Sequence, residues 1–134
     1  MGGPRIRVDP TLPAPIWSQI EEAVRYLVAS GALGPGDAVP SVRDLARDQR
    51  INPNTVAKAY QRLVEAGVLE TRRGEGTFVA QRPPAIPAAE RARALREGAT
   101  RLATLASNLG VSRAEATTAL QAAWPEPEPK GGRR

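Results

Sequence analysis

Three short hydrogen-bonding side chains, Asn52, Asn54 and Thr55, surround Pro53 at the start of a helix-forming run. Amides and hydroxyls donate and accept hydrogen bonds, and such groups pair with base edges or phosphates when a helix enters the major groove of DNA. Lys58 follows one helical turn later, where a cation suits a guanine edge or a phosphate. Helix capping by Asn52 and Thr55, with Lys58 as a solvated charge, explains the same residues equally well.

The composition is unsuited to most catalytic chemistry. The 134-residue chain contains no cysteine and no histidine. It therefore lacks thiol chemistry and the commonest general base and metal ligand. No pair of carboxylates that would form a catalytic cleft is apparent. We expect a protein that is not an enzyme and that uses no metal or cofactor.

The positive charge is concentrated around the Asn-Pro-Asn-Thr run. The chain carries 19 Lys and Arg against 14 Asp and Glu, a net charge of +5. Residues 50–73 hold five basic and two acidic side chains, whereas residues 1–49 hold five basic and six acidic ones. This local excess of cations favours an anionic partner.

The sequence does not indicate a membrane location. No apolar run approaches the roughly 20 residues that are needed to cross a bilayer. The first ten residues lack the apolar middle of a secretory signal. We expect a cytoplasmic protein with no membrane partner.

The first predicted helix is marked by Ile16, Ile20 and Val24, which recur at helical spacing, and it should end before Gly31. A loop rich in glycine and proline follows. Within this loop, residues 38–39 could add a short strand to a small sheet.

Two further helices should meet at a short turn. Ser41 is placed as the cap of the second helix, with Asp44 three residues later as the acidic partner of a capping box. That helix must end near residues 49–50, because Asn52 is a new cap and Pro53 suits the first position of the next helix. This spacing is typical of a helix-turn-helix.

The third helix is expected to bury one apolar stripe and to expose Asn54, Lys58 and Gln61 on the opposite side. A competing interpretation is a winged-helix module that binds another protein through this helix, without DNA binding. Such a module should expose an apolar face, whereas this row is polar. The residues of the buried stripe are Val56, Ala59, Tyr60, Leu63 and Val64.

After the third helix, two short extended segments, residues 68–72 and 77–80, are joined by a glycine-rich turn. A hairpin that follows three helices is the winged form of the helix-turn-helix. Arg72 and Arg73 at its tip could follow phosphates or enter the minor groove, where Gly74 permits close approach. A solvated turn without any partner is the alternative.

Arg43 lies in the first turn of the second helix, where the helix dipole disfavours a cation. A phosphate or a guanine edge would compensate, and Ser41 with the free amides beside it makes a suitable phosphate site. An ion pair from Arg43 to Asp44 or Asp48 is the alternative.

Beyond Pro83, a proline-rich linker leads to an alanine-rich helix over residues 88–109. Alanine and leucine recur along it in the three-four rhythm that is typical of close helix contact. We favour dimerisation through this seam, although it could instead contact only the last helix of the same chain, residues 112–124. The seam consists of Ala92, Leu95, Ala99, Leu102, Ala106 and Leu109.

Residues 15–80 resemble the N-terminal DNA-binding domain of GntR-family bacterial transcription regulators, through "PGD", "PSVRDLA", "NPNTVAKAYQRL", "GVLETRRGEGTFV" and their spacing. The helical tail resembles that of the YtrA-like subfamily, in which two helices mediate dimerisation. The resemblance implies a homodimeric regulator, expected to be a repressor, that binds near-palindromic operator DNA. It leaves any small-molecule effector unknown. The implied operator contacts are Ser41, Arg43, Asn52, Asn54, Thr55, Lys58, Tyr60, Arg72, Arg73 and Gly74.

One position departs from the family pattern. At Gln49-Arg50 the family usually has an apolar residue and a glycine. Either Arg50 adopts a left-handed conformation, at a cost of about 1 to 2 kcal/mol, or the second helix runs slightly longer. The angle between the second and third helices depends on which of these occurs.

We therefore predict a mostly α-helical fold with a small β-hairpin. A winged helix-turn-helix DNA-binding domain should cover residues 1–82. A short two-helix region for dimerisation or effector binding should follow over residues 83–124. The remaining residues, 125–134, should form a disordered tail because they have almost nothing to bury.

Overall fold

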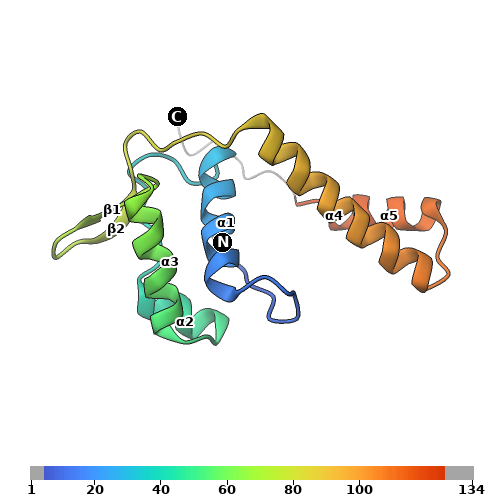
Figure 1. Ribbon diagram of the computed structural model, residues 1–134, viewed down its shortest axis with the longest axis horizontal. Helices are drawn as coiled ribbons and strands as arrows, with labels where there is room; N and C mark the ends of the chain where they lie inside the picture. Colours follow the sequence, from blue (N-terminus) through green and yellow to red (C-terminus); the bar gives the residue numbers. More distant parts are fainter. Residues whose placement is uncertain (1–4, 126–134) are drawn as a thin grey trace. The chain divides into compact units, whose positions relative to one another are not determined.

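The computed structural model describes residues 5–125, which fold into five helices and one two-stranded hairpin (Figure 1). The chain divides between Ile86 and Pro87 into two compact units. The tail predicted to be disordered covers residues 125–134, and all of it except Pro125 lies outside the described part of the chain. The elements are α1 (Ile16–Ala29), α2 (Val42–Gln49), α3 (Pro53–Glu65), β1 (Leu69–Arg72), β2 (Gly76–Val79), α4 (Ala88–Asn108) and α5 (Arg113–Ala123).

Helix α3 is the central element of the first unit. It packs against α1, α2 and β1. Ile20 and Val24 of α1, together with Val56 and Leu63 of α3, are completely buried. These residues belong to the apolar stripes that the helical spacing predicts, so the stripes form the core as expected.

Side chains cap α2 and α3 at their first turns. Ser41 Oγ accepts a hydrogen bond from the Asp44 amide at 3.0 Å, and Asn52 Oδ1 accepts one from the Asn54 amide at 2.8 Å. Pro53 opens α3, where an amide would have no partner within the helix. Both caps lie where the sequence predicts them, but the predicted capping box at α2 is incomplete, because the Asp44 carboxylate pairs with Arg47.

The turn between α2 and α3 is made by Arg50, which has a φ of 58° and a ψ of 50°. Of the two alternatives that the sequence left open, the left-handed arginine is therefore correct, and α2 ends at Gln49. The Ile51 amide donates to the Ala46 carbonyl at 2.9 Å, which closes the end of the helix. This closure keeps Arg50 in a conformation that glycine adopts without strain.

The segment before α1 explains why position 49 is polar. The Gln49 side-chain oxygen accepts a hydrogen bond from the Val8 amide at 3.0 Å. Arg5 pairs with Asp48 at 3.2 Å, and Ile6 between these contacts is only 3% exposed. The amino-terminal segment is thus attached to the end of α2 and supports the turn that follows it.

Strands β1 and β2 pair in antiparallel fashion, with Arg72 opposite Gly76 at the tip. A single bridge from Ala38 to Phe78 adds the short strand expected in the preceding loop. At the tip, Gly74 and Gly76 have φ values of 75° and 127°, which side-chain-bearing residues rarely adopt. The hairpin is the wing that the sequence predicts.

Helices α4 and α5 form a hairpin with little interior. The predicted capping box between Ser112 and Glu115 opens α5. Ala106 is the buried residue of these two helices, whereas Leu95 and Trp124 are 75% and 66% exposed. Two helices that bury so little surface gain little stability from contact with each other. None of the helices within residues 5–125 combines the length and the hydropathy that a transmembrane span requires.

Replacing Arg50 with glycine should stabilise the protein. The change removes left-handed strain but makes the unfolded chain more flexible, so we expect a net gain of about 1 kcal/mol in the free energy of unfolding. Urea denaturation followed by circular dichroism measures this quantity. Arg50→Ala is the matched control, because it removes the side chain and keeps the strain. An equal gain in both variants would contradict a backbone origin.

Candidate nucleic-acid interface

The exposed side of α3 carries the residues expected to read DNA. Asn54 and Lys58 are exposed and Thr55 is half-buried. The Asn52 side chain is occupied as the helix cap, whereas the Asn54 side chain has no hydrogen-bond partner within residues 5–125. Asn54 therefore offers a donor and an acceptor at the exposed start of the helix, which is the arrangement that suits an adenine edge.

Neither of the two carboxylates near Arg43 pairs with it. Of the two carboxylates that the sequence offers to Arg43, Asp44 pairs with Arg47 at 2.7 Å and Asp48 pairs with Arg5. The hydrogen bond from Arg47 is the main reason that the pKa of Asp44 is lowered, and the charge of Arg43 contributes least. In the described part of the chain, Arg43 is exposed without an ion pair.

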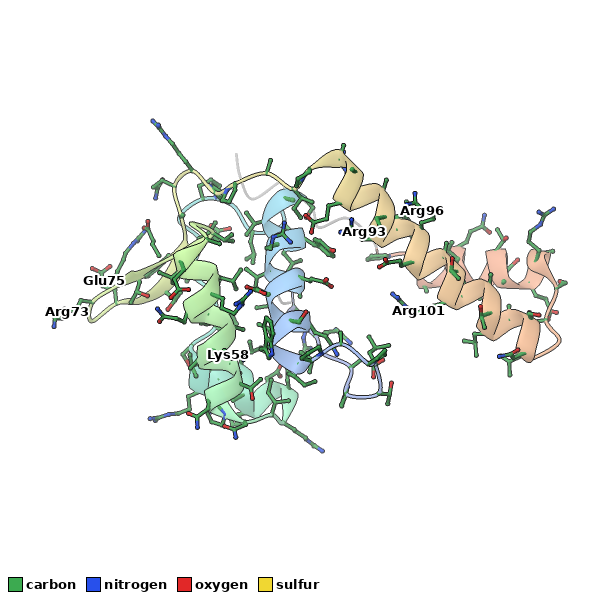
Figure 2. All side chains as sticks on the ribbon, viewed as in Figure 1. Lys58, Arg73, Glu75, Arg93, Arg96 and Arg101 are labelled. Atoms are coloured by element: carbon green, nitrogen blue, oxygen red, sulfur yellow. The ribbon has the colours of Figure 1, made fainter. Side chains whose placement is uncertain are left out.

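The two arginines of the wing differ in their surroundings. Arg72 donates twice to a carboxylate oxygen of Glu70, at 3.0 and 3.1 Å, and lies 4.0 Å from the ring centroid of Phe78. Arg73 is exposed at the tip (Figure 2), next to Gly74. Within residues 5–125, Arg73 has no ion pair, whereas Arg72 uses its Nε and one Nη atom for Glu70 and keeps the other Nη atom unengaged.

Tyr60 lies in the core, unlike the other residues that the resemblance places on DNA. It is 4% exposed, and its hydroxyl donates to the Pro40 carbonyl at 2.7 Å. Burial raises the pKa of the Tyr60 phenol. The side chain thus ties α3 to the residue before Ser41, and it holds the two helices of the interface together.

Two residues of α1 escaped the sequence analysis. Trp17 lies beside Lys58 and Arg62 of α3, and Glu21 accepts a hydrogen bond from Arg62 at 2.9 Å. The available signal was an aromatic and a carboxylate four residues apart, which places them on one face of α1. That spacing alone could not identify the residues they meet.

Three helices followed by a two-stranded wing define the winged helix-turn-helix class. Residues 17–79 match the model of the family described as bacterial regulatory proteins, gntR family. A solved structure, YtrA from Sulfolobus acidocaldarius, a GntR-family transcription factor, is 31% identical to this chain, and the match covers 97% of that structure. The chain therefore belongs to the gntR family. That structure covers 72% of this chain, with a TM-score of 0.53.

Two further relatives are similar over the winged domain. The HTH-type transcriptional repressor YtrA of Bacillus subtilis (strain 168) is 45% identical over 76 residues, which are 57% of this chain and 58% of the relative. This chain thus spans little more than half the length of that repressor. The DNA-binding domain of AraR, solved in complex with operator ORX1, is 25% identical with a TM-score of 0.51, and the match covers 60% of this chain and all of that one.

Removing the Tyr60 hydroxyl should lower the stability of the fold. In Tyr60→Phe the Pro40 carbonyl loses its donor, so we expect the free energy of unfolding to fall by about 1 to 2 kcal/mol. Thermal and urea denaturation measure this change. Stability equal to that of the wild type would show that the 2.7 Å hydrogen bond does not support the interface.

Proposed function

We propose that the chain is a transcription repressor that binds operator DNA in a sequence-specific manner. The observation that carries this proposal is the position of Arg43, a cation at the start of α2 whose two neighbouring carboxylates are paired with other arginines. A phosphate would satisfy this cation, and the Ser41 hydroxyl and the first amides of α2 lie beside it. The operator complex of the AraR domain supports this function, because that domain shares the fold.

The remaining candidate residues are also placed suitably for contact with duplex DNA. With the start of α3 in a major groove, Asn54 and Thr55 would face base edges and Lys58 would reach a guanine or a phosphate. The wing would place Arg73 and Gly74 against the neighbouring backbone or minor groove. A protein-binding module would need a large apolar surface on α3, and Pro53 and Ala57 are the only exposed residues of this helix that are not polar or charged. The known regulators that this chain resembles support a protein that is not an enzyme and that acts in the cytoplasm.

The second unit supplies the dimer contact in this proposal. An open groove of 740 Å³ lies between α4 and α5, and it is lined by four of the six predicted seam residues. Trp124 and Leu120 of α5 also line it, and both are exposed. Because the hairpin leaves these side chains in water, a second copy of the hairpin is the occupant we infer. The four seam residues are Leu95, Ala99, Leu102 and Ala106.

Selection from random duplexes, followed by titration of the selected duplex, tests DNA binding by the wild-type chain. Arg43→Ala should lower the affinity by about ten- to hundredfold and reduce the slope of log affinity against log salt by about 2, since each of the two protomers loses one phosphate contact. Its free energy of unfolding should stay unchanged. Arg82→Ala is the control, because it removes an exposed arginine outside the proposed interface. Equal losses in both variants would indicate a general charge effect and contradict the role of Arg43.

Leu95→Glu should convert the dimer into monomers, because it places a charge inside the apolar groove. Sedimentation velocity measures the association state, and operator titration should show weaker binding because two half-sites are no longer linked. Leu105→Glu is the matched control, since Leu105 is 55% exposed but does not line the groove. A dimer that survives Leu95→Glu would contradict this interface.

A further inference from the structure

Trp17 of α1 contacts two cations of α3. The Lys58 Nζ atom lies 4.7 Å from the centroid of the indole ring, and the Arg62 guanidinium carbon lies 4.6 Å from it. Both distances are within the limit of about 6 Å for a cation–π interaction. The amino-terminal ends of α1 and α3 lie on the same side of the first unit (Figure 1). The indole contacts α3 at Lys58 and Arg62, so it lies beside the middle turns of that helix.

The two cations differ in how their charges are balanced. Lys58 and Arg62 are four residues apart on one helix, where like charges repel. Arg62 donates to Glu21 at 2.9 Å, and the Glu21 side chain is only 19% exposed. Within residues 5–125, Lys58 has no carboxylate partner. The charge of Arg62 is thus neutralised by α1, whereas Lys58 keeps its charge and is held by the indole alone.

We propose that Trp17 is a positioning residue for DNA recognition, and that its indole holds the Lys58 ammonium group in place before DNA arrives. This inference rests on the proposed operator binding. A free lysine side chain loses rotamer entropy when it is ordered, and a side chain that is already ordered avoids part of that cost on binding. The ammonium group has three N–H donors, so contact with a ring face leaves donors for a phosphate or a guanine. Arg62 links α3 to α1 through Glu21 and makes no DNA contact.

A double-mutant cycle on the selected duplex tests the coupling between Trp17 and Lys58. Trp17→Leu keeps an apolar side chain and removes the π face, so affinity should fall about five- to tenfold, whereas Trp17→Phe keeps a π face and should stay within about twofold of the wild type. In a Lys58→Met background, Trp17→Leu should have little further effect, because its partner is already absent. The same loss in both backgrounds would mean that Trp17 acts through packing, and would overturn the inference.

A second measurement does not depend on DNA or on any substitution. The chain has two lysines, Lys58 and Lys130, so its lysine side-chain NMR spectrum contains two sets of signals. The indole ring current should shift the Lys58 ε-methylene protons upfield relative to those of Lys130. Unshifted signals would overturn the inference even if the protein binds its operator. A wild-type chain that binds no selected duplex would instead overturn the proposed function, and the DNA role of Trp17 with it.

Discussion

Every feature of the candidate interface depends on the burial of one side of α3. Val56 and Leu63 are completely buried between α1, α2 and β1, and this packing determines which residues of α3 face outward. A helix has 3.6 residues per turn, so once Val56 and Leu63 face the core, Asn54 and Lys58 must face away from it. The outward direction of Asn54 and Lys58 is therefore a consequence of core packing.

Local signals were sufficient to predict most of the fold. The caps at Ser41 and Asn52, the proline at the start of α3 and the glycines of the wing each act within a few residues of chain, so their effects are readable from sequence. The sequence also allowed a left-handed Arg50 as one of two conformations of the turn. The sequence also predicted that Arg43 would need a partner, although it could not distinguish an ion pair from a phosphate.

Contacts between residues that are distant in sequence could not be predicted from the sequence. The hydrogen bond from Val8 to Gln49, the one from the Tyr60 hydroxyl to Pro40 and the indole beside Lys58 each join elements whose relative placement only the folded chain defines. The pairing of Arg72 with Glu70 could more easily have been predicted, since alternate residues of a strand share a face. That pairing makes the two wing arginines unequal, which their adjacency in sequence does not suggest. The predicted seam of α4 also lies largely on the open groove, and its pairing with a second chain stays a prediction.

The attachment of the amino-terminal segment to the end of α2 separates the orientation of the reading helix from its chemistry. The two contacts join residues 41 and 43 positions apart, and neither involves a side chain that faces the proposed groove. In the proposed complex, a change in this short segment would alter the support of the turn before α3 without changing Asn54, Thr55 or Lys58. The orientation of α3 and the identity of its exposed side chains would then be set by different parts of the chain.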